Sequence, residues 1–430
     1  MKIPEILIVE TLHQPGSLAR VLQVIGEAGL TIEHLNALRR EQGRTLWEIT
    51  LEMDEEHDRS LYERIDSLSN ARFVGKSDRV FTRHKGGKIR SASSLPINTQ
   101  QVLRDIYTPG VARVCLAIAK DPAQAYEYTN LGSTVAIVTN GTAVLGLGNI
   151  GALAGLPVME GKAALFAELV GITGVPILLD ERSTDGIVDV ITRIAPSFGA
   201  IQLEDIAAPE CFEIEARLRE RLDKPVLHDD QHGTAVVALA ALMNATRRVG
   251  RSLGDSVIGQ IGLGAAGLGI VRLLRSQGAL QILGADLDTR ALERLAALGG
   301  TPATLSRIMQ EADIVIATTG ARGLIKPDMV RQGQIVLALS NPDPEIEPLL
   351  ALEHGAAFAA DGKGINNVLG FPGLFRGALD ARARAFTDTM LLAAAHAIAE
   401  SAAGDDLVPD ALDKNVHTSV AAAVRAAATA

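Results

Sequence analysis

The sequence predicts an α/β protein in which a small ferredoxin-like domain precedes two larger α/β domains and a helical C-terminal segment. Three observations lead to this prediction. Strand-like and helix-like patterns alternate over the first 82 residues in the order βαββαβ, which is the ferredoxin-like layout. Short apolar runs bounded by turn residues, typical of buried parallel strands, recur from residue 135 onward. A glycine-rich turn then joins an apolar strand to a helical pattern near residue 262, as in a Rossmann-type domain.

Composition places the chain among globular proteins of two or three domains. The 430 residues are 47% hydrophobic, which is enough for buried cores, and the net charge of −10 argues against nucleic-acid binding. Cys115 and Cys211, the two cysteines, lie in apolar or helical contexts and indicate a reducing compartment without disulfides. The chain has no signal-peptide pattern and no apolar run of ~18–20 residues, so we expect a cytoplasmic protein without a membrane partner.

The first domain is predicted from six element patterns joined by turn signals. Residues 5–13 alternate as a strand, and a turn at Gln14-Pro15-Gly16 precedes a helix over 17–28 that stops at Gly29. The other elements are expected as strands over 31–40 and 45–53, a helix over 58–67 and a strand over 72–81. A polar linker with several Lys and Arg residues follows.

Two acidic pairs, Glu204–Asp205 and Asp229–Asp230, each follow a short apolar run. A helical pattern over 209–222 separates them, so the order is strand, acids, helix, strand, acids. The carboxyl ends of neighbouring parallel strands open into one crevice, which would bring the two pairs together. Converging carboxylates repel one another, and Mg²⁺ or Mn²⁺ prefers such all-oxygen ligands. We therefore predict a divalent-metal site, with helix capping by the same acids as the alternative.

A dinucleotide site is predicted where a strand over 256–261 runs into a GxGxxG turn and a helix follows. Gly262 permits the tight turn, Gly264 lets the pyrophosphate approach, and Gly267 allows close packing of helix and strand. Asp286 ends the next strand, as expected for an acceptor of the ribose 2′-hydroxyl, and favours NAD. Arg290 lies close enough in sequence to keep NADP as the alternative.

The motifs LEDI at 203–206 and HDDQHGTA at 228–235 resemble the malic enzyme family in its compact bacterial form. YTPG at 107–110 and PVMEGK at 157–162 occur in the same order as in that family, and the resemblance extends from about Ser91 to the C-terminal end. It implies oxidative decarboxylation of L-malate to pyruvate and CO2, with reduction of NAD(P) and dependence on Mg²⁺ or Mn²⁺. The segment HQPGSLARVLQVIGEAGLTIEHL at 13–35 resembles an ACT domain, a small regulatory module.

The malic enzyme resemblance also implies roles for individual residues. It gives Glu204, Asp205 and Asp230 as metal ligands, Tyr107 as general acid, Lys162 as general base and Asp229 as the group that tunes the base. It also implies that Asn341 and the pair Asn366–Asn367 face malate and the nicotinamide cofactor; which residue of the pair contacts the substrate stays open. A lysine base needs a depressed pKa, which burial near other positive charge would provide. The ordinary alternatives are a tyrosine that only packs and a lysine that snorkels to the surface.

The region around the predicted turn at Asn140-Gly141-Thr142 departs from the family pattern. Bacterial members usually carry Asp at the position of Asn140, and larger members place a carboxylate-binding Arg in the matching hairpin, where this chain has none. How the substrate carboxylates are held therefore stays open. The run over 144–150 is expected as a strand with a close backbone approach, and a helix over 163–170 is expected to have Lys162 at its head.

We expect five parts in the chain: an ACT domain over 1–82, a linker over 83–95, a substrate and metal domain over 96–238, an NAD(P)-binding domain over 239–375, and C-terminal helices over 376–430. Helical stretches over 375–403 and 417–430 would pack back on the core and on a partner subunit of a homodimer or larger assembly. The loop over 13–17 either contacts a small effector or serves dimerisation alone. Two other functions stay open: an ACT-linked NAD-dependent dehydrogenase of another small acid, and a metabolite-sensing protein with weakened catalysis.

Overall fold

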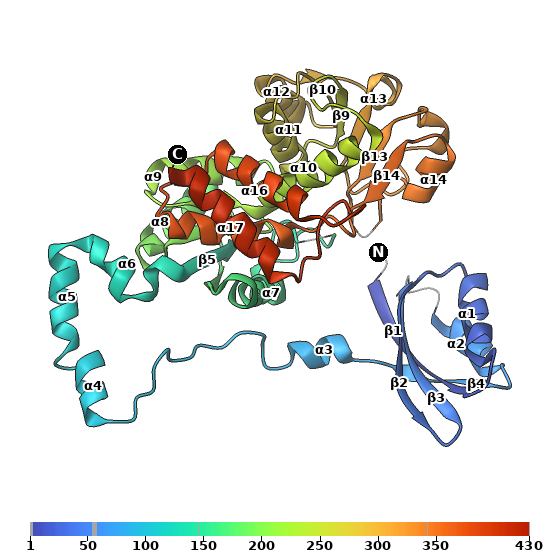
Figure 1. Ribbon diagram of the computed structural model, residues 1–430, viewed down its shortest axis with the longest axis horizontal. Helices are drawn as coiled ribbons and strands as arrows, with labels where there is room; N and C mark the ends of the chain where they lie inside the picture. Colours follow the sequence, from blue (N-terminus) through green and yellow to red (C-terminus); the bar gives the residue numbers. More distant parts are fainter. Residues whose placement is uncertain (1–2, 54–57, 145, 342, 430) are drawn as a thin grey trace. The chain divides into compact units, whose positions relative to one another are not determined.

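The computed structural model describes the chain except for residues 1–2, 54–57, 145, 342 and 430 (Figure 1). Two compact units make up the chain, Met1–Lys88 and Ile89–Ala430. The first unit contains one antiparallel sheet, and the second contains two parallel sheets. The predicted α/β class is therefore confirmed.

The first unit has the predicted ferredoxin-like order. Its elements are β1 (Ile3–Leu12), α1 (Ser17–Glu27), β2 (Ile32–Glu41), β3 (Arg44–Met53), α2 (Asp58–Asp66) and β4 (Ala71–Lys76), in the sheet order β2-β3-β1-β4. The inward faces of these elements supply the buried core, namely Leu7, Val9, Val21, Ile25, Ile49, Leu51, Leu61 and Ile65. The last strand ends at Lys76 rather than at Phe81, because Ser77 accepts the backbone N–H of Arg79 and α3 (Arg79–His84) begins there.

The first parallel sheet of the second unit has the strand order β6-β5-β7-β8. Its elements are β5 (Thr134–Thr139), α7 (Ala152–Val170), β6 (Thr173–Leu178), α8 (Thr184–Ile194), η4 (Ala195–Ser197), β7 (Ala200–Leu203), α9 (Glu210–Arg221) and β8 (Val226–His228). Every residue of β5, β7 and β8 is buried, as expected for continuous apolar runs in a parallel sheet. Strands β7 and β8 are parallel neighbours, so their carboxyl ends meet at one edge.

Two local predictions in this region are wrong. The run over 144–150 forms a loop rather than a strand, and its described part makes only an isolated bridge between Val144 and Gly148. Helix α7 begins at Ala152 rather than at residue 163, so Lys162 lies inside the helix instead of at its head. Pro157 lies early in this helix, where its missing N–H removes a single backbone hydrogen bond.

The segment before β5 consists of short helices with little burial. These are α4 (Gln100–Ile106), α5 (Val111–Lys120), η2 (Pro122–Gln124), α6 (Ala125–Tyr128) and η3 (Asn130–Ser133). No residue between Ile89 and Lys120 is buried, although α5 carries large apolar side chains such as Leu116. We call residues 89–120 the arm.

The second parallel sheet has the strand order β11-β10-β9-β12-β13-β14, which is the 3-2-1-4-5-6 order of a Rossmann domain and confirms that prediction. Its elements are α10 (Asp229–Val249), β9 (Val257–Ile261), α11 (Ala265–Ser276), β10 (Gln281–Ala285), α12 (Thr289–Ala297), β11 (Thr301–Pro302), α13 (Leu305–Glu311), β12 (Ile314–Ala317), η5 (Pro327–Met329), β13 (Ile335–Ala338), α14 (Pro348–Glu353) and β14 (Phe358–Asp361). Helix α10 leads from the end of β8 to β9 and is buried along most of its length. None of the helices in the described ranges is long and apolar enough to cross a membrane.

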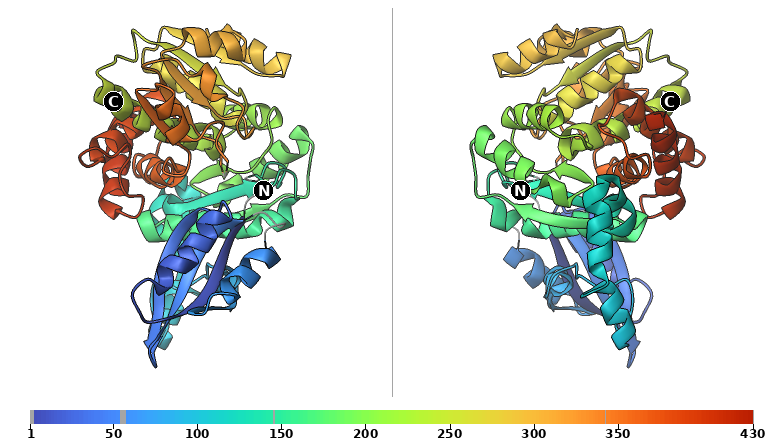
Figure 2. Two further views of the ribbon diagram at one scale, coloured as in Figure 1. Left: turned by 90° about the vertical axis from the view of Figure 1, so that its right-hand side faces the viewer. Right: turned by 90° about the vertical axis from the view of Figure 1, so that its left-hand side faces the viewer.

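Three further helices complete the second unit: α15 (Phe371–Asp380), α16 (Asp388–Ser401) and α17 (Lys414–Thr429), preceded by η6 (Asn367–Leu369). The predicted helix over 375–403 is interrupted between α15 and α16, where Arg382 has a left-handed φ of 50°. Helix α16 packs on α10 and α11, and α17 packs on α15 and α7 (Figure 2). The α15–α17 contact is tight, because a Cβ on Gly373 would lie only 2.6 Å from the Val420 side chain.

Candidate active site

The two acidic pairs adjoin at the carboxyl edge of the first parallel sheet. Glu204 and Asp205 directly follow β7, and Asp229 and Asp230 follow β8 as the first residues of α10. One carboxylate oxygen from each of Glu204, Asp205 and Asp230 lies within 4.8 Å of the other two. We call these three residues the acidic trio.

The acidic trio suits a divalent cation. All its donors are oxygens, the ligands that Mg²⁺ and Mn²⁺ prefer. Glu204 and Asp205 are 2% and 3% exposed, and Oδ2 of Asp205 is buried without a hydrogen-bond partner among the described residues. Burial raises the pKa of Glu204 to about 7, and burial together with repulsion from Asp230 raises the pKa of Asp205. A cation would give the orphaned oxygen a partner and keep the carboxylates ionised.

Helix capping, the alternative use of these acids, is not what the structure shows. The N-cap residue of α9 is Pro209 and that of α10 is His228, and neither makes a side-chain capping hydrogen bond. Instead, Oδ2 of Asp230 accepts the backbone N–H of Asp205 at 2.9 Å and joins the ends of β7 and β8. The geometry favours the metal site.

Lys162 is 8% exposed and reaches from α7 to the acids. Its Nζ donates to Oδ2 of Asp229 in a short contact and lies 3.1 Å from Oε1 of Glu204. Burial disfavours the ammonium, but attraction to Asp229 and Glu204 outweighs burial and holds the pKa of Lys162 above its usual range. The expected depression of this pKa is therefore wrong for the polypeptide alone, because the neighbours of Lys162 are acids and not bases. Burial also raises the pKa of Asp229 to about 6, and Lys162 opposes that rise.

A cavity of about 490 Å³ joins the acidic trio to the Rossmann domain. One wall carries Lys162 and the trio, and the other carries Gly264, Ala265 and Ala266 of the glycine turn together with Thr318, Asn341, Asn366 and Asn367. Lys162 is the one Lys or Arg among the residues that line this cavity in the described chain. The cavity therefore brings the predicted metal, dinucleotide and substrate residues to one place.

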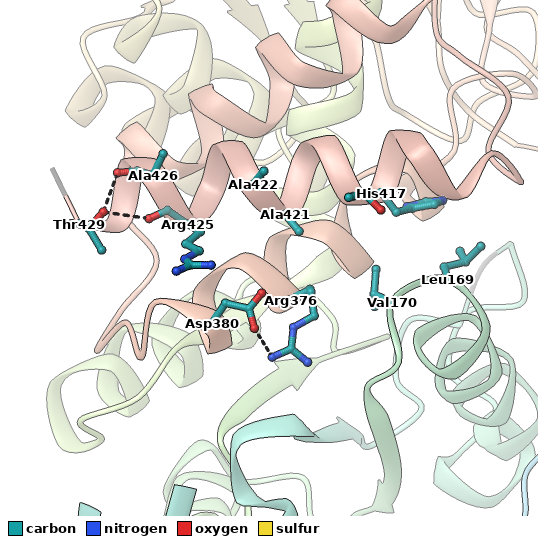
Figure 3. A pocket seen from close by; sticks show the side chains of 11 residues that line it. Leu169, Val170, Arg376, Asp380, His417, Ala421, Ala422, Arg425, Ala426 and Thr429 are labelled. Carbon is teal, nitrogen blue, oxygen red and sulfur yellow. Dashed lines mark hydrogen bonds and ion pairs between the residues drawn. The ribbon is translucent and has the colours of Figure 1, made fainter. Parts of the chain in front are cut away.

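A larger cavity, of about 610 Å³, lies elsewhere, between α7, α15 and α17 (Figure 3). Figure 3 shows Arg376 paired with Asp380 on α15 and Arg425 on α17 above them. The lining of this cavity includes no residue of the acidic trio and no part of the glycine turn. Nor does its lining contain any of the other predicted site residues.

The glycine turn has the geometry of a dinucleotide loop. Gly262 has a φ of 86°, and a Cβ there would lie 2.7 Å from the Thr318 carbonyl oxygen. A Cβ on Gly267 would lie 2.0 Å from the Gly262 oxygen, whereas one on Gly264 would meet nothing within 4 Å. The open space beside Gly264 is where the backbone can approach a pyrophosphate. Asp286 follows β10 and accepts the backbone N–H of Leu263, at 2.6 Å, within this turn.

The three predicted asparagines all line the cavity, but they are engaged differently. Asn341 donates to the Gly362 carbonyl at 3.0 Å, and Oδ1 of Asn366 accepts the backbone N–H of Val368 at 3.0 Å. Asn367 donates through Nδ2 to Oδ2 of Asp229 at 2.8 Å, the same oxygen that Lys162 contacts. Of the Asn366–Asn367 pair, Asn367 is thus the one bound to the acid beside the base.

Five predicted site residues do not line the cavity: Tyr107, Asp229, Gly262, Gly267 and Asp286. Asp229 contacts the lining residue Lys162, and the other three, Tyr107 apart, belong to the glycine turn or bond to it. Tyr107 follows α4 on the arm and is 67% exposed. The nearest large apolar residues of the arm, Leu103 and Ile106, are also exposed, at 40% and 37%. Among the described residues, none of the arm is buried by the rest of the second unit.

Sequence reasoning missed three buried residues around the site. Nζ of Lys162 lies 4.4 Å from the ring centroid of Phe371, which is 0% exposed. Gln202 donates to Oε2 of Glu204 at 2.6 Å, and Glu215 accepts the backbone N–H of His228 at 3.0 Å. A polar Gln inside the apolar run of β7 was the available signal for Gln202. Nothing local in the sequence connects Phe371 with Lys162.

Three segments match known family descriptions. Residues 6–70 match the ACT domain, residues 86–219 the malic enzyme N-terminal domain, and residues 359–429 the malic enzyme NAD-binding domain. NAD-dependent malic enzyme 1 of Bacillus subtilis (strain 168) is 50% identical over 425 residues, covering 98% of this chain and 97% of the relative. NAD-dependent malic enzyme of Geobacillus stearothermophilus is 42% identical over 439 residues, covering 96% of this chain and 91% of the relative.

Solved structures agree with these matches. The malic enzyme from Pyrococcus horikoshii has a TM-score of 0.77 at 40% identity, covering 82% of this chain and 90% of the other. The NAD-dependent malic enzyme from Thermotoga maritima has a TM-score of 0.76 at 38% identity, covering 81% of this chain and 99% of the other. The resemblance predicted from the motifs is confirmed over nearly the whole chain. The chain therefore belongs to the malic enzyme family, whose reaction is the metal-dependent oxidative decarboxylation of malate, and carries an ACT domain before the enzyme body.

Proposed function

We propose that the chain converts L-malate to pyruvate and CO2, with NAD as the preferred oxidant, in the cavity between its two parallel sheets. One observation carries the proposal. Lys162 lies beside Asp229 and the acidic trio on one wall of the cavity, and the glycine turn forms the other wall. Malate held between the walls would have its C2 carbon near both a buried base and the dinucleotide.

In this proposal Lys162 accepts the proton of the C2 hydroxyl while the C2 hydride passes to the nicotinamide. Glu204, Asp205 and Asp230 would hold Mg²⁺ or Mn²⁺, which would supply Lewis-acid polarisation of substrate oxygens. A cation there would weaken the attraction of Glu204 and Asp230 for the Lys162 ammonium and so lower the pKa of Lys162, while the larger attraction of Asp229 would stay. Asp229 keeps the Nζ of Lys162 in place.

Amide groups are proposed to hold the substrate carboxylates. The cavity offers Asn341, Asn366 and Asn367, and Lys162 is the sole cation among its described lining residues. Amide N–H groups can bind carboxylate oxygens without an arginine. In this proposal, neutral amide donors on the Rossmann side of the cavity take over the carboxylate-binding role of the hairpin arginine that this chain lacks.

The preference for NAD is supported by Asp286. Its two carboxylate oxygens accept the backbone N–H groups of Leu263, at 2.6 Å, and Asp288, at 2.9 Å, so the charge is fixed beside the glycine turn. A fixed negative charge at the ribose would repel the 2′-phosphate of NADP.

Malate oxidation tests the proposal directly. With Mn²⁺ present, we expect near-ultraviolet absorbance of the reduced dinucleotide to appear with malate and NAD, with pyruvate as product, and at least about tenfold more slowly with NADP. A chelator should abolish the signal, and added Mn²⁺ should restore it. Absence of reduction in folded protein that still binds NAD would contradict the assignment of malate as substrate.

We also propose a homodimer in which the arm of one copy completes the cavity of the other. The arm has no buried residue, and Leu116 on α5 is 72% exposed. Further exposed apolar side chains occur in the sequence between the cavity residues Ala143 and Val158. They are Leu147, Ile150 and Leu153, at 51%, 38% and 78% exposure. Packing the arm of one copy on these side chains of another would bury both and carry Tyr107 to the cavity as general acid.

Mixing two inactive variants tests this exchange. Tyr107→Phe and Lys162→Met should each be at least about a hundredfold slower than wild type. Co-expressed, they should recover about a quarter of the wild-type rate, because half of the dimers are mixed and one of their two sites is intact. If Tyr107 acted within its own chain, no site in the mixture would be intact and the rate would stay at that of the single variants.

A small effector is proposed to bind the ACT domain. A cavity of about 400 Å³ lies at the predicted loop and is lined by His13, Gly16, Arg40, Thr45 and Trp47 among others. Arg40 supplies a cation suited to the carboxylate of an amino acid. The malate assay above, run with and without single amino acids, tests for this regulation.

The five-part division of the chain and a cytoplasmic location remain part of the same proposal.

A further inference from the structure

The ammonium of Lys162 is enclosed by two carboxylates and one aromatic face. Nζ contacts Oδ2 of Asp229 and lies 3.1 Å from Oε1 of Glu204. On another side lies the ring of Phe371, with the centroid 4.4 Å from Nζ, while Lys162 also lines the cavity. Phe371 is 0% exposed and offers no hydrogen-bond acceptor, so water has no place on that side of the lysine. An ammonium over an aromatic face is attracted by the negative charge of the ring face.

The ring is held in place from two directions. Phe371 meets Phe166 edge to face at 4.9 Å and 87°, and Phe166 lies one turn after Lys162 on α7. Helix α15, which begins at Phe371, is held by α17 through the tight contact of Gly373 with Val420. The ring therefore cannot move away from Lys162 without disturbing two packed helices.

We propose that Phe371 is a positioning residue that holds Nζ of Lys162 for proton transfer from the C2 hydroxyl of malate. This inference rests on the proposed function of Lys162. In the transfer the O–H bond breaks and an N–H bond forms on Nζ, while the C2–H electron pair leaves with the hydride to NAD. Lysine thus gains its charge during the step, and the ring face stabilises that charge more strongly in the transition state than before it.

Helix α15 itself provides a matched control. Phe375 is also 0% exposed, lies one turn after Phe371 and meets Phe166 edge to face at 5.5 Å and 88°. Its ring makes no cation–π contact with Lys162 in the described chain. Phe375 also meets Phe386 at 5.2 Å and 76°, so Phe375→Leu removes at least as much aromatic packing as Phe371→Leu but no contact with Lys162.

We expect Phe371→Leu to lower kcat by about tenfold, with KM for malate and Mn²⁺ affinity changed by less than about twofold. Phe375→Leu should keep kcat within about twofold of wild type while lowering Tm at least as much as Phe371→Leu does. Equal losses of kcat in the two variants would overturn the proposal. A loss in Phe371→Leu that appears in KM alone would overturn it as well.

Fluorinated phenylalanines separate the charge effect from packing. Placing one, two and then three fluorines on the ring at position 371 weakens its negative face with little change in shape. We expect kcat to fall with each fluorine at 371 and to stay constant in the same series at 375. A flat series at 371 would overturn the proposal even if Phe371→Leu fails to fold. The wild-type protein in the same assay distinguishes failure of this proposal from failure of the proposed function. If wild type does not oxidise malate, the proposed function itself has failed.

Discussion

Replacing Lys162 with methionine should lower kcat for malate oxidation by about a thousandfold and leave NAD binding unchanged. Methionine has a similar length but cannot accept a proton. Lys162 is also the one cation among the described residues of the cavity wall, so no neighbouring Lys or Arg can replace it. Steady-state rates at saturating malate and Mn²⁺, together with NAD titration by fluorescence, measure the two parts of this expectation.

Lys224 supplies the control for the lysine substitution. It is also partly buried and donates to the carbonyl oxygens of Ala195 and Phe198, both at 2.5 Å, away from the cavity. Lys224→Met should lose some stability and keep kcat within about twofold of wild type. Retention of more than about a tenth of the wild-type rate by Lys162→Met would show that another group accepts the proton.

Replacing Asp230 with asparagine should weaken Mn²⁺ binding by at least about a hundredfold, and activity should fall with it. Asparagine keeps the shape of the side chain but removes one of three charges that converge within 4.8 Å. Electron paramagnetic resonance of free Mn²⁺ measures the affinity without any turnover. Asp223→Asn is the matched control, because Asp223 is exposed and pairs only loosely with Arg384 at 3.4 Å. Unchanged Mn²⁺ affinity in Asp230→Asn would place the metal elsewhere.

The same acids give the metal-free protein a characteristic dependence on pH. Burial raises the pKa of folded Glu204 to about 7, above its ordinary value of 4.5. Between these values the folded state binds more protons than the unfolded state, so stability falls as the pH rises through this window. Burial also raises the pKa values of Asp205, Asp229 and Asp230, which act in the same direction, whereas buried His228, whose pKa is lowered to about 4, opposes the decline. Because these acids outnumber the histidine, Tm in chelator should decline from about pH 5 to about pH 7, and saturating Mn²⁺ should remove most of the decline. Parallel Tm profiles with and without Mn²⁺ would contradict this.

Much of the fold, the glycine turn and the two acidic pairs could be predicted from the sequence because their signals are local. The alternation of strands, the GxGxxG turn and the acids after β7 and β8 each lie within a short stretch, and parallel pairing then brings strand ends together. The start of α7 was missed for the opposite reason. Gly155, Pro157 and Gly161 are all helix-weakening residues, yet burial of Met159, Lys162 and Phe166 at helical spacing stabilises the helix through them.

Features that depend on distant contacts could not be read from the sequence. The pKa of Lys162 depends on which charges reach it, and Asp229 and Glu204 do so only once β7, β8 and α7 have packed. Phe371 contacts the same lysine although the whole Rossmann domain separates the two residues in sequence. Tyr107 fits the motif but lies on the exposed arm, and the proposed contact with a second copy depends on residues of another chain.

The tight contact between α15 and α17 has a consequence for biosynthesis. On the ribosome, Lys162 and all the acids around it emerge well before Val420, which fits against Gly373. Until that late segment has folded back, α15 lacks one of the two contacts that hold Phe371 beside the lysine. A nascent chain could then bind metal while the support of its base is still incomplete. Chains that end before α17 would therefore have lower activity than the full chain.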